Sequence, residues 1–184
     1  MVHRIDFESL FSLKGRTALI SGASSGLGEH FAQVLSAAGA HVVVAARRAD
    51  KLTSLVQTLR EQGGMADAIT MDVTSRESVR DAFEAFDAQF SQLDILVNNA
   101  GIANPPLRFV DATEDEWGPV LDVNLTGAWR VAQAAARRMK QQRSGNIAFD
   151  NSYFSEFVYM STDYQLTKNN FVDGDFENLQ KAII

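Results

Sequence analysis

The chain lacks cysteine entirely and has only three prolines among its 184 residues. Without cysteine it has no disulfide bond, no thiolate metal ligand and no thiol nucleophile, which agrees with a reducing cytoplasm. Long apolar runs are also missing, since no segment approaches the roughly 18 apolar residues that a membrane span requires. We therefore expect a cytoplasmic protein without a membrane partner.

Positive charge is scarce as well. The 17 Lys and Arg residues are outnumbered by 23 Asp and Glu residues, which gives a formal net charge of -6. Such a chain has no broad attraction for phosphate backbones, so we expect no nucleic-acid partner. The three histidines, His3, His30 and His41, form no metal-like cluster in the sequence, and we expect no metal site.

The remaining composition, 46% hydrophobic and 22% charged, fits one globular domain spanning residues 1–184. Aliphatic and β-branched runs alternate with helical apolar spacing, which predicts strands at 17–20, 41–46, 66–71 and 94–97, and helices at 27–38 and around 52–59, 79–86, 117–123 and 128–139. This alternation indicates an α/β fold, a Rossmann-type doubly wound parallel sheet in three α/β/α layers. Trp117 and Trp129 are expected to pack helices against the sheet.

A glycine-rich turn joins the first predicted strand to the first helix. Its residues are Gly22, Ser24, Ser25, Gly26, Leu27 and Gly28, with the spacing Gly-x-x-x-Gly-x-Gly. Glycines there allow the backbone to approach a diphosphate, and the following helix offers free N–H groups and a partial positive charge. The alternative is an ordinary turn in which the glycines only allow the chain to reverse direction and bind no ligand.

Three further motifs follow in order. Asp72-Val73 ends the third predicted strand, Asn98-Asn99-Ala100-Gly101 ends the fourth, and Asn124 lies in the sequence Asp122-Val123-Asn124-Leu125-Thr126-Gly127. Together with the glycine turn they resemble the short-chain dehydrogenase/reductase family over residues 14 to about 148.

The resemblance implies a dinucleotide site. In that reading the glycine turn holds the diphosphate, Asp72 and Val73 contact the adenine, and Asn98, Ala100 and Gly101 flank the adenosine ribose. The bland alternatives are that Asp72 is an acid near a helix N-terminus and that Asn98 forms hydrogen bonds at a strand end.

The end of the second predicted strand bears on the choice of cofactor. A carboxylate that binds both ribose hydroxyls is common there in NAD sites, but this chain has Ala46 followed by Arg47 and Arg48. Because a guanidinium group pairs well with phosphate, we predict NADP rather than NAD, with Arg47 as the better partner of the 2'-phosphate. The alternative is that both arginines are simply solvated at a helix start.

Candidate catalytic residues lie mostly near the C-terminus. Tyr164 and Lys168 are four positions apart and share a face if the segment is helical, so the ammonium can lower the pKa of the phenol. By resemblance, Tyr164 transfers a proton, Lys168 contacts the nicotinamide ribose, Ser152 binds the substrate oxygen and Asn124 holds a relay water. Ser152 precedes Tyr164 by twelve positions, one fewer than is usual in the family.

The composition changes after the family-like core of residues 1–148. Residues 144–184 contain six acids, two basic residues, two alanines and all three tyrosines. Asp150 stands where a buried strand is expected, so that strand must end early or be exposed. The atypical segment 149–184 lacks the pattern of the last family strands. It is either a diverged, shortened family C-terminus or an unrelated sequence, and the composition break favours the second.

These observations favour an NADP-dependent oxidoreductase that interconverts a carbonyl and a secondary alcohol, resembling 3-oxoacyl reductase-like members of the family. One alternative is a catalytically impaired dinucleotide-binding or assembly module. Another is a marginally folded truncated product. A sheet that lacks its last strands exposes an edge and apolar faces, so we expect a homo-oligomer. The identity of the small-molecule carbonyl or alcohol substrate is not encoded in any motif.

Overall fold

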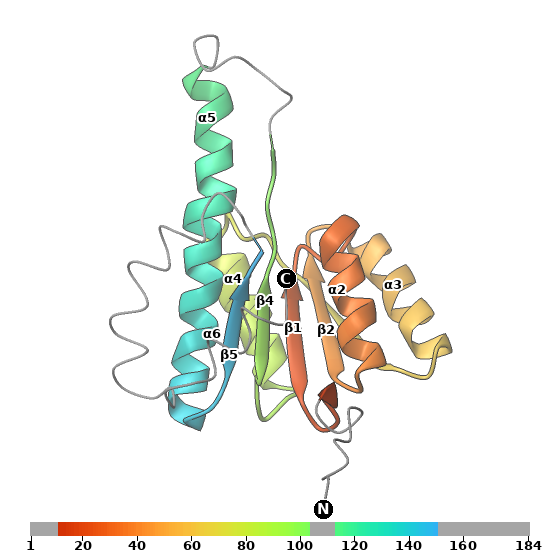
Figure 1. The fold of residues 1–184 in the computed structure, drawn as a ribbon. Helices are drawn as coiled ribbons and strands as arrows, with labels where there is room; N and C mark the ends of the chain where they lie inside the picture. The colour runs from red at the N-terminus through yellow and green to blue at the C-terminus, as the bar shows by residue number, and fades with distance from the viewer. Residues whose placement is uncertain (1–10, 104–112, 151–184) are drawn as a thin grey trace, which may run out of the picture.

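The computed structural model describes residues 11–103 and 113–150, which form a parallel sheet flanked by helices (Figure 1). The described strands are β1 (Thr17–Ser21), β2 (His41–Ala46), β3 (Met65–Thr70), β4 (Ile95–Asn98) and β5 (Asn146–Phe149). Their order in the sheet is β3-β2-β1-β4-β5, and every neighbouring pair is parallel. The predicted Rossmann-type sheet is confirmed.

The helices cover both faces of the sheet, so the predicted three-layer arrangement is also confirmed. Helices α2 (Gly26–Ala37) and α3 (Ala49–Glu61) lie on one face, and α4 (Arg76–Asp87) and α6 (Ala128–Gln142) lie on the other (Figure 1). The inner positions of α3 and α4 that the helical spacing predicted are all buried: Leu52, Leu55, Val56, Leu59, Val79, Ala82, Phe83 and Phe86. Burying each large apolar side chain stabilises the fold by about 1.5–3 kcal/mol.

Strand β5 ends one residue before Asp150. Its last residue, Phe149, pairs with Asn98, and the backbone N–H of Asp150 still donates to the carbonyl of Asn98 at 3.3 Å. The early end of β5 is one of the two alternatives, an early end or an exposed strand, that an acid at this position predicted. The structure places the carboxyl of Asp150 at the edge of the sheet where the other strands also end.

A single long helical segment replaces the two separate helices predicted around 117–123 and 128–139. It runs through α5 (Glu114–Leu121), a π-helical turn (Asp122–Gly127) and α6 (Figure 1). A capping box between Thr113 and Glu116 begins it, and hydrogen bonds from the backbone and hydroxyl of Thr113 lower the pKa of Glu116. None of the described helices is long and apolar enough to cross a membrane.

Both tryptophans differ from expectation. Trp117 on α5 is 57% exposed and Trp129 on α6 is 46% exposed, so neither is buried between helix and sheet. The prediction that they pack helices against the sheet is wrong. The core against α6 is built instead from smaller side chains such as Val131 and Ala135.

Candidate functional site

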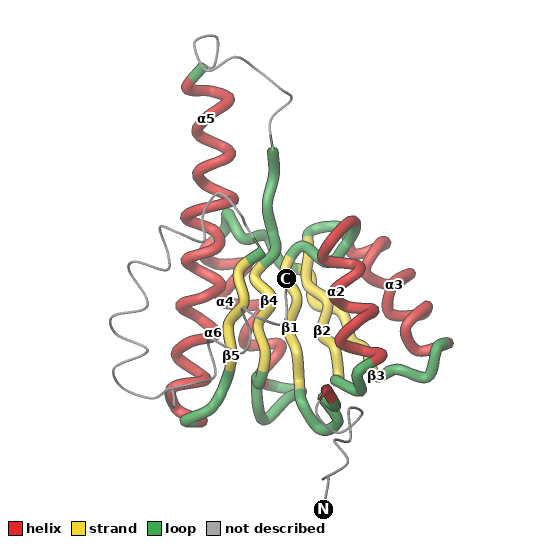
Figure 2. Tube along the Cα trace, viewed as in Figure 1, coloured by secondary structure: helices red, strands yellow, loops and turns green. Residues whose placement is uncertain are grey.

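A cavity of about 540 Å³ lies at the C-terminal edge of the sheet. The loops after the strands gather at this edge (Figure 2). The chain order reverses between β1 and β4, and ligands of open α/β sheets bind at this switch point. Eleven predicted site residues line the cavity: Gly22, Ser24, Ser25, Leu27, Arg47, Arg48, Asp72, Val73, Ala100, Gly101 and Asn124. Its volume is within the usual range for small-molecule sites.

The glycine turn between β1 and α2 adopts a shape that only residues without a side chain accommodate at Gly22, Gly26 and Gly28. Gly22 and Gly26 have φ of 70° and 63°, the left-handed region that favours glycine. At Gly28, a Cβ would stand 2.5 Å from the carbonyl oxygen of Gly22. The turn is therefore closed by backbone packed on backbone, and Gly26 and Gly28 shape the cavity although they are not among its lining residues.

The N-terminus of α2 faces this turn with its N–H groups available. Ser25 is the N-cap residue, but its side chain makes no hydrogen bond to the first turn of the helix. The unpaired N–H groups at a helix start carry a partial positive charge and suit an anion such as phosphate. The residues present thus fit the diphosphate of a dinucleotide.

Asn98, the last residue of β4, and Asn99, which follows it, have different positions. Asn98 is 1% exposed, accepts a hydrogen bond from the Ser21 hydroxyl at 3.1 Å and donates to the carbonyl of Ala128 at 2.7 Å. Asn99 lines the cavity and donates to the carbonyl oxygens of Ser21 and Gly22 at 3.0 and 3.3 Å. Asn98 therefore links the end of β4 to β1 and α6 through buried hydrogen bonds, as the strand-end alternative predicted. Asn99 holds the glycine turn through its hydrogen bonds to the turn's carbonyl groups.

Arg48 is the arginine that the structure joins to the glycine turn. Its Nη2 donates to the Ser24 hydroxyl at 2.8 Å and the Ser25 hydroxyl at 2.7 Å, and its Nε donates to Ser24 at 3.2 Å. Arg47 also lines the cavity. Both guanidinium groups lie after β2, and Arg48 is held against the turn that suits a phosphate.

Asp72 follows β3 and shapes the loop before α4. Its Oδ1 accepts hydrogen bonds from the backbone N–H of Thr74 at 3.0 Å and from the Thr74 hydroxyl at 2.8 Å. The N-cap of α4 is Ser75, whose side chain accepts from the backbone of Ser78, so Asp72 is not itself the cap. Asp72 and Val73 face the same cavity as the glycine turn.

Asn124 lies in the π-helical turn and is 6% exposed. Its Oδ1 accepts from the backbone N–H of Ile102 at 2.8 Å, and its Nδ2 donates to the carbonyl of Ile102 at 2.8 Å. The wider turn of a π-helix directs this side chain inward, a feature frequent at functional sites. Asn124 thereby fixes the loop after β4 at the cavity wall.

We expect Asn124→Ala to lower the free energy of unfolding by about 2 kcal/mol, because the part-buried N–H and C=O of Ile102 each lose a partner. Urea denaturation followed by circular dichroism measures this loss. Asn146→Ala is the control, since Asn146 is exposed at the start of β5 and its loss should cost under about 0.5 kcal/mol. Equal losses in the two variants would contradict a structural role for the Asn124 side chain.

Several residues that line the cavity were not predicted as site residues. Asn99 lies within the motif after the fourth predicted strand but was not assigned a role there, and Ile102 and Asp150 belong to no recognised motif. Burial raises the pKa of the Asp150 carboxyl. Ser152, Tyr164 and Lys168 lie outside the described residues, so their roles stay predictions.

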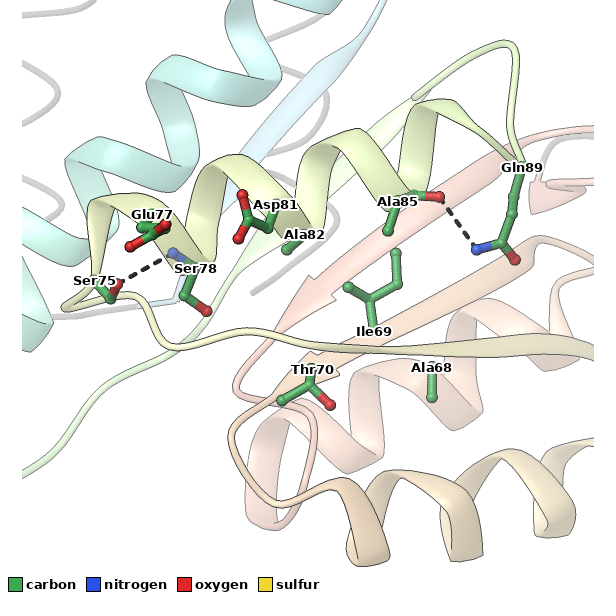
Figure 3. Close-up of a pocket in the computed structure, with 10 residues that line it drawn as sticks. All are labelled: Ala68, Ile69, Thr70, Ser75, Glu77, Ser78, Asp81, Ala82, Ala85 and Gln89. Atoms are coloured by element: carbon green, nitrogen blue, oxygen red, sulfur yellow. Dashed lines mark hydrogen bonds between the residues drawn. The ribbon is translucent and has the colours of Figure 1, made fainter.

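A second cavity, of about 610 Å³, lies between β3 and α4 (Figure 3). Glu77 and Asp81 line it, together with hydroxyl groups of Thr70, Ser75 and Ser78. No basic side chain is among its described lining residues, which disfavours a phosphate-bearing ligand. The cavity at the glycine turn is therefore the candidate site, although it is slightly smaller.

Comparison with known proteins gives consistent matches. Sorbose reductase sou1 of Schizosaccharomyces pombe is 38% identical over 165 residues, which cover 87% of this chain and 65% of that protein. A short-chain type dehydrogenase/reductase from Mycobacterium marinum matches with a TM-score of 0.73 and 39% identity, over 77% of this chain and 56% of that one. A gluconate 5-dehydrogenase from Burkholderia cenocepacia, solved with NADP and tartrate, gives a TM-score of 0.71 and 39% identity, over 76% of this chain and 54% of that one.

The chain thus spans between about half and two thirds of the length of these relatives. The family model described as short chain dehydrogenase matches residues 16–169. That match continues past residue 148 and includes Ser152, Tyr164 and Lys168, which favours a diverged family segment over an unrelated sequence up to residue 169. By fold, by glycine turn and by this match, the chain belongs to the short-chain dehydrogenase family.

Proposed function

We propose that the protein is an NADP-dependent oxidoreductase that interconverts a carbonyl group and a secondary alcohol. The observation that carries the proposal is the cavity at the β1–β4 switch point, where the N-terminus of α2 and Arg48 converge on one glycine turn. A helix N-terminus and a guanidinium group are two independent sources of positive charge for a dinucleotide phosphate.

The positions of the lining residues suggest how a dinucleotide lies in the cavity. Its diphosphate would contact the turn at Gly22, and its adenosine would lie toward the ends of β2 and β3, near Arg48 and Asp72. The nicotinamide would then lie toward the ends of β4 and β5, beside Asn124. When bound, the nicotinamide supplies or accepts the hydride.

The chain's own residues would handle the proton. Reduction of a carbonyl leaves an alkoxide that needs a proton, and a phenol whose pKa is lowered by a nearby ammonium can supply it. We assign this role to Tyr164 with Lys168, and assign to Ser152 the hydrogen bond to the substrate oxygen. Asn124 would hold the relay water. These assignments rest on the family resemblance and on the family match that spans all four residues.

A titration of the purified chain with NADPH and with NADH, followed by fluorescence, tests the proposal directly. The same samples are then given a panel of ketones and ketoses, and NADPH oxidation is recorded at 340 nm. NADPH binding together with turnover supports the oxidoreductase. Binding without turnover leaves the alternative, a dinucleotide-binding module, and no binding of either cofactor refutes the proposal.

The sequence favoured Arg47 as the partner of the 2'-phosphate, but the hydrogen bonds of Arg48 to Ser24 and Ser25 lead us to propose Arg48 for this role instead. We expect Arg48→Gln to weaken NADPH binding by about 10- to 30-fold, the cost of one charge-assisted contact, and to weaken NADH binding by less than about threefold. Arg47→Gln is the matched control, because Arg47 lines the same cavity without a hydrogen bond to the serines of the turn. A larger loss of NADPH binding in Arg47→Gln would show that Arg47 binds the 2'-phosphate.

We also propose that the protein self-associates. Trp117 and Trp129 expose large aromatic surface on α5 and α6, and exposed apolar patches mark interaction sites. Sedimentation equilibrium should give a mass at least twice the 20.2 kDa of one chain. The double variant Trp117→Ser, Trp129→Ser should shift that mass toward a monomer, and an unchanged mass would place the interface elsewhere.

A further inference from the structure

The carboxyl group of Asp150, which lines the candidate site, lacks a hydrogen-bond partner for one of its oxygens. Its Oδ2 is buried and is the one such side-chain atom among the described residues that has no hydrogen-bond partner. Leaving a buried polar atom unpaired is destabilising, and the loss is greater for a charged group. Asp150 lines the cavity at the glycine turn, so a ligand in that cavity can supply the missing donor.

The position of Asp150 assigns it to the substrate end of the cavity. It follows β5, the strand next to β4, whereas the glycine turn and Arg48 follow β1 and β2. Two residues further along the chain is Ser152, the residue assigned to the substrate oxygen. In the sheet, β4 thus separates Asp150 from the glycine turn after β1, and Asp150 is close in sequence to Ser152.

The charges around the cavity restrict what Asp150 can bind. The charged side chains among the described lining residues are Arg47, Arg48, Asp72 and Asp150. Both arginines follow β2, so neither is placed to balance a second negative charge near Asp150. Lys168 is assigned to the nicotinamide ribose and to Tyr164, so in that assignment its ammonium is not the partner of a substrate carboxylate. Burial raises the pKa of Asp150, which agrees with a carboxyl that lacks a cationic partner. An anionic substrate would be repelled, whereas a hydroxyl group donates a hydrogen bond without adding charge.

We propose that Asp150 contacts a hydroxyl group of the substrate and thereby selects neutral polyhydroxylated alcohols and ketoses over sugar acids of the same length. This inference rests on the proposed oxidoreductase function, because it places the substrate beside the nicotinamide end of the cavity. It goes further by naming the chemical class of the substrate and the side chain that recognises it.

The test compares sorbitol with gluconate, which have the same chain length and differ by one carboxylate. Each is titrated into the protein saturated with NADPH, where neither can be oxidised, and the fluorescence of bound NADPH reports the ternary complex. We expect sorbitol to bind at least about tenfold more tightly than gluconate. We expect Asp150→Asn, which has nearly the same shape, to reduce that ratio by about tenfold, because the negative charge is gone.

Asp115→Asn is the matched control, since it removes the same charge from an exposed position on α5 and should leave the ratio unchanged. A wild-type preference for gluconate, or an unchanged ratio in Asp150→Asn, overturns the proposal. A loss of NADPH affinity above about threefold in Asp150→Asn also overturns it, because the carboxyl would then contact the cofactor. Asp150→Ser, with its melting temperature measured, replaces Asp150→Asn if that variant does not fold.

Failure of the oxidoreductase proposal can be distinguished from failure of the inference about Asp150. If the wild-type chain does not bind NADPH, the oxidoreductase proposal fails, and the sorbitol and gluconate titrations are repeated without NADPH by calorimetry. A sorbitol preference that depends on Asp150 then supports the polyol site alone. Absence of that preference overturns the inference about Asp150 as well.

Discussion

Replacing Gly28 with alanine should reduce NADPH affinity by at least about 100-fold, or roughly 2.7 kcal/mol. The added Cβ would stand 2.5 Å from the carbonyl oxygen of Gly22 and would also meet the side-chain nitrogen of Asn99. The first of these contacts is with backbone, so the turn itself must move. Overpacking of this kind costs about 1–3 kcal/mol, and the displaced turn is the part of the site that suits phosphate.

The effect of Gly28→Ala is measured by NADPH fluorescence titration together with thermal unfolding. Gly118→Ala is the matched control, because Gly118 lies inside α5 and a Cβ there meets nothing within 4 Å. In that position alanine should stabilise the helix by about 0.5–1 kcal/mol and leave NADPH affinity unchanged. If Gly28→Ala binds NADPH as tightly as the wild type, the turn is not the diphosphate site.

The fold was predictable because burial imposes a period on the sequence. In α3 the apolar positions Leu52, Leu55, Val56 and Leu59 recur at helical spacing, and the structure buries all four against the sheet. A continuous β-branched run such as Val42 to Val44 suits a strand that is covered on both faces. Neither inference needs knowledge of distant contacts.

Contacts that depend on side-chain direction were not predictable in the same way. Asn98 and Asn99 are adjacent and chemically identical, yet one packs behind β4 and the other lines the cavity. Successive residues of a strand point to opposite faces, so the motif alone does not decide which asparagine faces the ligand. The same holds for Arg47 and Arg48, of which only Arg48 bonds to the serines of the turn.

Trp117 shows a second limit of the sequence. A large aromatic residue on a helix suggests packing against the core, but α5 has no buried residue in the structure. The apolar residues of α5 therefore do not indicate that this helix packs against the sheet. Exposed aromatic residues of this kind suit contact with a partner, which one chain's sequence does not reveal.

Replacing Tyr164 with phenylalanine should lower kcat for carbonyl reduction by about 100- to 10,000-fold, the range for loss of a general acid. Phenylalanine retains the ring and removes only the hydroxyl that donates the proton. Because Tyr164 is assigned to proton transfer and not to cofactor binding, NADPH affinity should change by less than about twofold. Single-turnover oxidation of NADPH with a reactive diketone measures the loss.

The chain provides matched controls for this experiment in Tyr153 and Tyr159, its two other tyrosines. Tyr153→Phe and Tyr159→Phe remove the same hydroxyl from the same segment, but neither position has a lysine four residues later. Both should retain kcat within about threefold, because Tyr164 is the tyrosine to which we assign an ammonium partner, Lys168, that would lower the pKa of its phenol. A comparable loss in either control would mean that this segment supports the site structurally, and that the proton comes from another group.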